Sequence, residues 1–116
     1  MTLDEFRLQM ESYRRKADDE AKSLKDTHTA LDRLRVLYQR LNDEEKRMAD
    51  TILAEWALSE DENARFDALA LINDFRIATA IPGLQKLAER LAMSIAPSAP
   101  YELKKVRRIL EKLGVS

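Results

Sequence analysis

Apolar side chains recur every three or four residues along most of this chain, which is the spacing of one face of an amphipathic helix. The first set is Leu3, Phe6, Met10, Tyr13, Ala17, Ala21 and Leu24, and the next is Leu31, Leu34, Leu37, Tyr38 and Leu41. Residues 1–81 contain neither glycine nor proline, whereas strand-rich proteins rarely run so far without turn-forming residues. The pattern therefore predicts an all-α chain of five or six helices that form antiparallel helical hairpins.

Residues 3–41 form either one helix or two. Against a break, a strict seven-residue spacing joins Leu3, Met10, Ala17, Leu24, Leu31 and Tyr38. In favour of a break, Asp26-Thr27-His28-Thr29 is rich in side chains that compete for backbone hydrogen bonds, and Thr27 can cap a helix. A coiled coil needs a second apolar position in each heptad, and here that position is polar at Glu20 and at Thr27. We therefore favour a break near residues 26–29.

Capping boxes mark several helix starts, since a short polar side chain and a glutamate three residues later can bond to each other's backbone. The pairs with this spacing are Thr2 with Glu5, Asn42 with Glu45, and Ser59 with Glu62. The expected later helices cover about residues 43–58, 60–75, 80–95 and 101–113. Pro82 suits the first turn of its helix, Ser98 is a candidate cap, and Gly114 ends the last helix.

The helix over residues 60–75 is expected to be the central one. One of its faces carries Ala64, Ala68, Leu71, Ile72 and Phe75, and another carries Phe66, Leu69 and Ala70. Its polar residues Asn63, Asp67 and Asp74 form only a narrow strip. A helix that is apolar on two sides is typically covered on both, so we expect this one to lie between two layers.

Residues 59–93 carry three groups of residues typical of a known repeat. These are Asp61-Glu62-Asn63-Ala64-Arg65, Ala68-Leu69 with Leu71, and Ala80-Ile81-Pro82 with Leu84 and Leu87. With them the stretch resembles one repeat of the HEAT family of α-solenoids. The resemblance implies a right-handed stack of helical hairpins, and it implies that Asp61 and Arg65 link neighbouring repeats. Because no second copy of the motif is found, a compact bundle containing one HEAT-like hairpin is the open alternative.

Composition narrows the chemistry that this chain can carry. Its 116 residues are 45% hydrophobic and 35% charged, which is typical of a single globular domain. We expect one domain over residues 1–116, in which a helix of residues 1–28 can project from a HEAT-like core of residues 29–116. The absence of cysteine excludes thiol chemistry, and a single histidine, His28, excludes most metal and acid–base sites. We therefore expect no enzyme activity, no cofactor and no metal.

No apolar run approaches the length of a membrane span, and the N-terminus is acidic rather than a signal peptide. These features predict a cytoplasmic protein that makes no membrane contact.

Charge is distributed in blocks of opposite sign. Residues 42–75 carry three basic and ten acidic side chains, whereas residues 76–116 carry eight basic and three acidic ones. The last helix has a basic face made of Lys104, Lys105, Arg107, Arg108 and Lys112. These side chains are candidate contacts for phosphates or for an acidic partner, or they form a solvated face.

The helix over residues 80–95 offers a candidate partner surface. Its expected inward residues are Leu84, Leu87, Ala88, Leu91 and Ile95, and its opposite sector presents Lys86, Glu89, Arg90 and Met93. A flexible methionine among charged residues is typical of an adaptable contact surface. Alternatively, Met93 folds over the loop of residues 97–100.

These observations favour a non-catalytic protein–protein interaction module, such as an adaptor, a regulatory protein or an immunity or inhibitor protein. One alternative is a nucleic-acid-binding protein that uses the basic face of the last helix. A second alternative is a homo-oligomer that self-associates through a coiled coil of residues 3–41.

Overall fold

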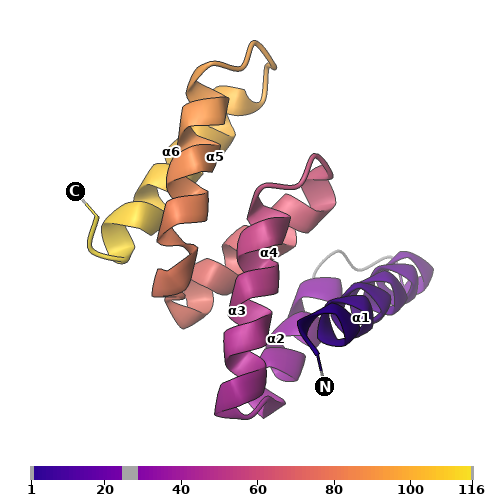
Figure 1. Cartoon of the computed structure of the whole chain (residues 1–116). Coiled ribbons are helices and arrows are strands. Elements are labelled where there is room, and N and C mark those ends of the chain that lie inside the picture. The colour runs from indigo at the N-terminus through magenta and orange to yellow at the C-terminus, as the bar shows by residue number, and fades with distance from the viewer. Residues whose placement is uncertain (1, 25–28, 116) are drawn as a thin grey trace. The chain divides into compact units, whose positions relative to one another are not determined.

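The computed structural model of the chain describes residues 2–24 and 29–115 (Figure 1). These residues form α1 (Leu3–Leu24), α2 (Thr29–Arg40), α3 (Asp43–Ala57), α4 (Glu62–Phe75), α5 (Ile81–Ala92) and α6 (Ala99–Lys112), with a short 3-10 helix η1 (Ala78–Ala80) before α5. The described residues contain no strand. The all-α prediction with up to six helices is therefore confirmed.

Helices α1 and α2 pack against each other, so the described parts of residues 3–41 form two helices rather than one. The hydroxyl of Tyr13 donates to the Arg33 carbonyl oxygen at 3.3 Å, and Arg33 also pairs with Glu20. The structure thus confirms the favoured alternative of a break. The expected cap Thr27 and the histidine His28 lie outside the described residues.

Of the three expected capping boxes, one is complete and one shows a single bond of the pair. The Glu5 amide donates to Thr2 Oγ1 at 3.2 Å, which closes one side of the first box. In the second box, Asn42 and Glu45 exchange hydrogen bonds: the Glu45 amide donates to Asn42 Oδ1 at 2.8 Å, and the Asn42 amide donates to Glu45 Oε1 at 3.0 Å. This arrangement satisfies two amides that helix geometry leaves without partners.

The third predicted box, Ser59 with Glu62, is wrong. Helix α4 begins at Glu62, and its cap is Asp61, whose side chain accepts from the Asn63 amide at 2.9 Å. Ser59 Oγ accepts instead from the Asp61 amide at 3.1 Å, within the preceding turn. An aspartate nearer the helix therefore displaces the serine, because both are good caps and only one can occupy the position.

The structure confirms some of the predicted helix ends and contradicts others. Gly114 has a φ of 93° just beyond α6, and the Val115 amide donates to the Leu110 carbonyl oxygen at 2.9 Å, which confirms the predicted helix end. Helix α4 ends in the same left-handed conformation, but at Arg76, with a φ of 50°. Pro82 lies in the first turn of α5 as predicted. Ser98 occupies the cap position of α6 without a side-chain cap bond, so its predicted capping role is wrong.

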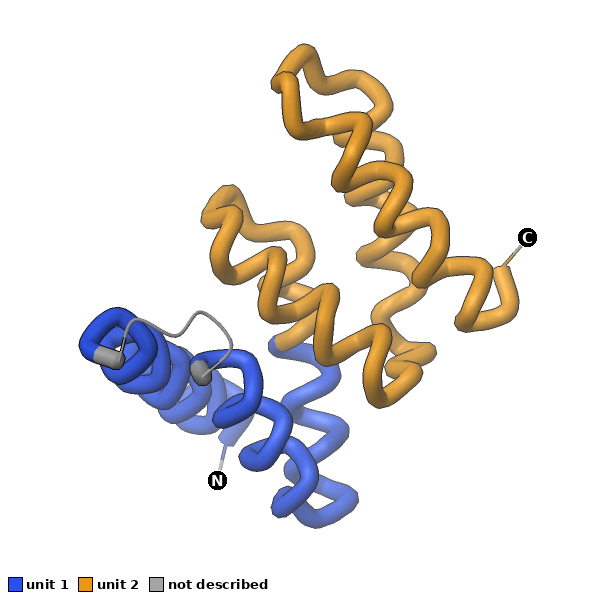
Figure 2. Tube along the Cα trace, turned by 180° about the vertical axis from the view of Figure 1, so that it is seen from behind, with its two compact units in different colours: residues 1–52 blue, residues 53–116 orange. Residues whose placement is uncertain are grey.

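The chain divides into two units, residues 1–52 and residues 53–116, with the boundary inside α3 (Figure 2). Buried apolar residues of the first unit include Phe6, Met10, Ala17, Ala30, Leu31, Leu34 and Ile52. Those of the second unit include Leu53, Ala64, Ala68, Leu69, Leu71, Ile72, Leu84, Leu87, Val106 and Ile109. Each unit therefore has its own set of buried apolar side chains, and the single domain over residues 1–116 stays a prediction.

Two expectations about inward residues are wrong. Phe66 was expected on a covered face of the central helix, but its side chain is 52% exposed, whereas Asp67 of the expected polar strip is buried. Ile95 was expected to face inward, but it is fully exposed because α5 ends at Ala92. The Ser94 hydroxyl oxygen accepts from the Ala96 amide at 3.2 Å, which diverts that amide from helical bonding.

Candidate functional site

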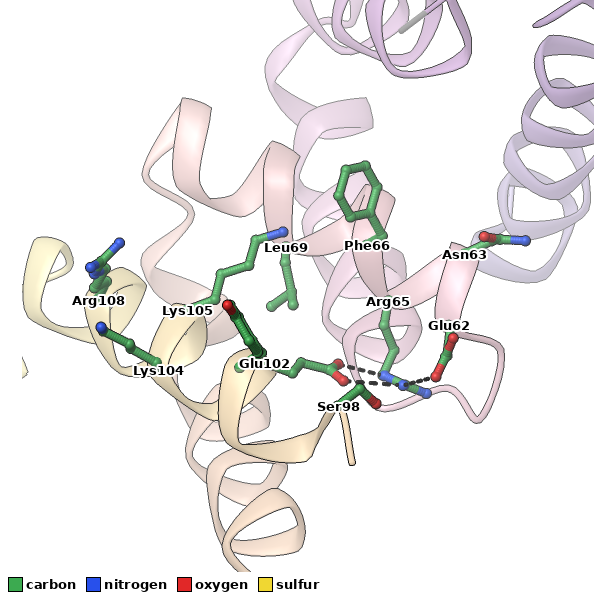
Figure 3. A pocket seen from close by; sticks show the side chains of 11 residues that line it. Glu62, Asn63, Arg65, Phe66, Leu69, Ser98, Glu102, Lys104, Lys105 and Arg108 are labelled. Carbon is green, nitrogen blue, oxygen red and sulfur yellow. Dashed lines mark hydrogen bonds and ion pairs between the residues drawn. The ribbon is translucent and has the colours of Figure 1, made fainter. Parts of the chain in front are cut away.

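A groove of about 740 Å³ lies between α4 and α6 in the second unit, and we call it the α4–α6 groove (Figure 3). Its lining residues on α4 include Glu62, Arg65, Phe66 and Leu69, and those on α6 include Tyr101, Glu102, Lys104, Lys105 and Arg108. The residues are spaced by three or four positions on each helix, so one face of each helix forms one wall. Basic and aromatic side chains dominate this lining.

An ion pair between Arg65 and Glu102 joins the two walls. Arg65 Nε donates to Glu102 Oε1 at 2.7 Å, and Arg65 Nη2 donates to Glu102 Oε2 at 3.2 Å, which is a bidentate contact (Figure 3). Arg65 Nη1 also donates to the carbonyl oxygens of Ser59 and Glu60, at 3.0 and 3.1 Å. The planar fork of arginine suits this geometry, so Arg65 fastens α6 to both α4 and the turn before it.

The pairing also changes the charge that the groove presents. The Arg65 and Glu102 side chains are only 13% and 19% exposed, so solvent screens their attraction less than at an open surface. The hydrogen bond from Arg65 to Glu102 is the main reason that the pKa of Arg65 is raised above its ordinary value. Because these two charges balance each other, the net charge of the groove is set by the remaining cations and Glu62.

Phe66 is the principal apolar feature of the groove. Lys105 Nζ lies 4.4 Å from the centroid of the Phe66 ring, which is a cation–π contact (Figure 3). Burial lowers the pKa of Lys105, while the nearby Glu102 carboxylate acts in the opposite direction. The ring is thus held in place by a cation while half of its surface faces solvent.

Three further side chains of α6 border this aromatic surface. Tyr101 is 86% exposed and lies in the first turn of the helix. Lys104 and Arg108 are exposed one and two turns further on, and within the described part of the chain neither side chain forms an ion pair or hydrogen bond. Their charges are therefore available to an acidic group outside the protein.

The structure separates the predicted basic face into two sets. Lys104, Lys105 and Arg108 line the groove, whereas Arg107 and Lys112 are exposed on α6 away from it. The sequence did not identify Phe66 and Tyr101 as site residues. Their one detectable signal is that neither belongs to the main apolar stripe of its helix.

The predicted partner surface on α5 does not contribute to the groove. Lys86, Glu89, Arg90 and Met93 are all exposed, and none of them lines it. Arg90 Nη1 donates to the Leu58 carbonyl oxygen at 2.9 Å, which gives this side chain a structural contact. Met93 is 86% exposed, so the alternative in which it folds over the following loop is wrong.

The described residues hold no group of three histidine, cysteine or acidic side chains arranged to bind a metal ion. None of the described helices is both long enough and apolar enough to cross a bilayer. No protein-family model, curated protein or solved structure matches the chain. Function therefore has to be inferred from the groove itself.

Proposed function

We propose that this chain is a non-catalytic protein-interaction module whose partner docks in the α4–α6 groove. The observation that carries the proposal is Phe66, a large aromatic side chain left 52% exposed in a concave, cation-rimmed surface. Aromatic side chains in such positions commonly anchor partners, because covering the ring removes apolar surface from water. A protein segment that places an apolar side chain on Phe66 and acidic side chains near Lys104 and Arg108 would fit this surface.

The ion pair across the groove supports this proposal. Arg65 makes four hydrogen bonds to groups on α6 and on the turn before α4, so the two walls are linked in a fixed register without a partner. Because the groove is already formed, binding does not carry the entropy cost of ordering its walls. We therefore expect little change of backbone structure in the groove on binding.

The HEAT-like architecture remains part of the proposal. The Arg65–Glu102 pair connects the first helix of the α4–α5 hairpin to the helix that follows the hairpin. This resembles the arginine–acid links between neighbouring repeats that the sequence resemblance implies, with Glu102 in place of Asp61. Asp61 itself caps α4. A cytoplasmic location likewise remains a prediction from the sequence.

Single-stranded nucleic acid is a second candidate ligand, because Phe66 and Tyr101 are exposed beside three cations. Bases can stack on aromatic side chains while lysine and arginine contact the phosphates. Protein is the better candidate for two reasons. The groove offers only three such cations, and Glu62 at its edge would repel a phosphate.

The proposal is tested by comparing which host proteins the parent chain and two variants capture from a host lysate. The groove variant combines Phe66→Ser with Lys104→Glu, and the matched control combines Met93→Ser with Lys86→Glu on α5. All four positions are exposed, so both variants should fold. We expect one protein to be captured by the parent and the control and lost by the groove variant.

Two results would change the proposed docking surface or the proposed class of ligand. Loss in the α5 variant alone would move the docking surface to the α5 residues Lys86, Glu89, Arg90 and Met93. Capture that nuclease abolishes, and that weakens steeply with salt, would favour the nucleic-acid alternative.

A further inference from the structure

The end of the α5–α6 hairpin, residues 92–101, is exposed at every position except the buried Ala99 and carries no charge. Residues 92–101, which we call the apolar loop, read Ala-Met-Ser-Ile-Ala-Pro-Ser-Ala-Pro-Tyr and contain no charged side chain, in a chain that is 35% charged. Met93 and Tyr101 are each 86% exposed, and Ile95 is fully exposed. Exposed apolar clusters of this kind commonly mark a contact surface, since water solvates them poorly.

Several backbone amides of the apolar loop are already hydrogen-bonded within the hairpin. The amides of Met93, Ser94 and Ala99 donate to carbonyl oxygens of the same hairpin at 3.3, 3.2 and 3.0 Å. The Ala96 amide donates to the Ser94 hydroxyl oxygen, and Pro97 and Pro100 have no amide hydrogen. Moving a backbone amide out of water is costly unless it is already bonded, so these four amides can be buried at reduced cost.

Cations flank the apolar loop on both helices. The basic residues nearest to it are Arg90 on α5 and Lys104, Lys105, Arg107 and Arg108 on α6. At the helical rise, all five lie within about 10 Å of the loop along the helix axes, close to the screening length in physiological salt. The nearby acidic residues are Glu89 and Glu102, and Glu102 is already paired with Arg65.

We propose that the apolar loop inserts Met93 and Ile95 into an anionic lipid surface while the flanking cations contact the headgroups. The loop forms the exposed end of the α5–α6 hairpin (Figure 1), a protruding shape that suits a planar surface, whereas the α4–α6 groove is concave and suits a protein segment. Tyr101 can lie at the interface, where its ring is buried and its hydroxyl stays hydrated. Insertion depends on apolar area together with attraction to anionic lipids, and this hairpin supplies both.

The proposal departs from the sequence-based prediction of no membrane contact. That prediction rested on the lack of a membrane-spanning segment, which this binding mode does not need. The lipid contact also goes beyond the proposed docking of a protein in the groove. Tyr101, Lys104, Lys105 and Arg108 belong to both surfaces, but Met93 and Ile95 do not line the groove. Substitutions at these two positions therefore test the lipid contact without altering the proposed protein site.

Co-sedimentation of the purified chain with lipid vesicles tests this proposal. One vesicle preparation contains phosphatidylcholine alone, and the other contains equal parts of phosphatidylcholine and phosphatidylglycerol. We expect the parent to sediment with the anionic vesicles and only weakly with the neutral ones. The double variant Met93→Ser with Ile95→Ser should bind the anionic vesicles about tenfold less, because two inserted apolar side chains are lost.

The matched control is Leu8→Ser with Val36→Ser, which removes two exposed apolar side chains from the first unit. It should bind anionic vesicles as the parent does, and both variants should keep the parent's circular dichroism spectrum. Failure of the parent to bind anionic vesicles, or equal binding by the loop variant, would overturn the proposal. Light scattering that shows a parent dimer abolished by the loop variant would assign the loop to self-association and would also overturn it. Phe66→Ser should leave vesicle binding unchanged, so this test is independent of the groove.

Discussion

The α1–α2 pair and the α4–α6 pair are both helix contacts, and among the residues that the structure describes the second pair borders a groove. Small residues lie where α1 meets α2, and Ala17, Ala21 and Ala30 form one buried cluster there. Long side chains separate α4 from α6, where Arg65, Phe66 and Lys105 line a groove of about 740 Å³. Alanine lets helix backbones approach closely, whereas long charged and aromatic residues keep them apart. The α4–α6 contact is therefore the one at which we propose that a partner docks.

Each pair also contains one arginine–glutamate link, and the two links differ in burial. The Arg33 and Glu20 side chains are 52% and 41% exposed, so solvent screens the pair and little stability depends on it. The Arg65–Glu102 pair is mostly buried and has two further carbonyl acceptors for Arg65. The difference indicates that the α4–α6 link maintains the groove, whereas the α1–α2 link adds little to a contact already made by alanines.

The largest expected change in stability comes from a substitution on the buried face of α4, compared with one on its groove side. Ile72 is fully buried, so Ile72→Asp places a carboxylate among apolar side chains and should cost about 4 kcal/mol or more of the free energy of unfolding. Phe66→Asp on the groove side should change the free energy by less than about 1 kcal/mol, because half of that ring already faces water. Thermal unfolding followed by circular dichroism measures both. An Ile72→Asp variant that melts near the parent would contradict the burial of this face.

A smaller effect is expected where α1 meets α2. Ala17 is buried, and Ala17→Leu adds three carbon atoms to a side chain in a close contact, at a cost of about 2 kcal/mol. Leu8 lies on the exposed side of α1, so Leu8→Ala should change stability by less than about 0.5 kcal/mol. Urea denaturation of both variants checks this difference. Equal stability of Ala17→Leu and the parent would show that the contact is not closely packed.

The two ion pairs allow a direct comparison. Glu102→Gln leaves Arg65 with a neutral acceptor and should destabilise the second unit by about 1.5 kcal/mol. The same change at the exposed position, Glu20→Gln, should cost less than about 0.5 kcal/mol. Urea denaturation measures the free energy of unfolding of both variants. A larger loss of stability for Glu20→Gln than for Glu102→Gln would show that the exposed pair is the more important link.

The smallest effect concerns a polar contact in the first unit. The Tyr38 hydroxyl donates to Asp50 Oδ1 at 2.8 Å. Burial raises the pKa of Asp50, and the hydrogen bond from Tyr38 and the charge of Lys46 oppose this rise only in part. A folded-state pKa above the unfolded value means that this group contributes stability at low pH and that the contribution is lost as pH rises through the folded pKa.

Asp50→Asn removes this titration while keeping an acceptor for Tyr38. The parent should therefore gain stability relative to Asp50→Asn as the pH falls from neutral towards the ordinary pKa of aspartate, about 4. Urea denaturation of both proteins across this range measures the difference. A relative loss of parent stability over the same interval would show that the pKa of Asp50 is lowered instead.

Local signals in the sequence predicted much of the fold. The Asn42–Glu45 box, Pro82 and Gly114 each depend on a few neighbouring residues, and all three appear where the sequence places them. Local signals were insufficient at two places: Asp61 rather than Ser59 caps α4, and α5 ends at Ala92, before Ile95.

The groove could not be predicted in the same way, because it depends on which residues of α4 meet α6. Arg65 and Glu102 are 37 positions apart, and no local pattern indicates that they pair. Periodicity placed Phe66 on a covered side of α4, since an aromatic residue is usually buried. In the structure Phe66 instead faces Lys105 of α6 across the groove, with half of its surface exposed.

Site-specific photocrosslinking tests the docking of a partner in the α4–α6 groove most directly. Benzoylphenylalanine would replace Phe66 in one sample, Leu8 in a second and Met93 in a third, and each would be irradiated in host lysate. We predict one specific crosslinked protein from position 66, which disappears when Lys104→Glu is added, and no such product from positions 8 and 93. The same product from position 8 or 93 but not from position 66 would contradict docking in the groove.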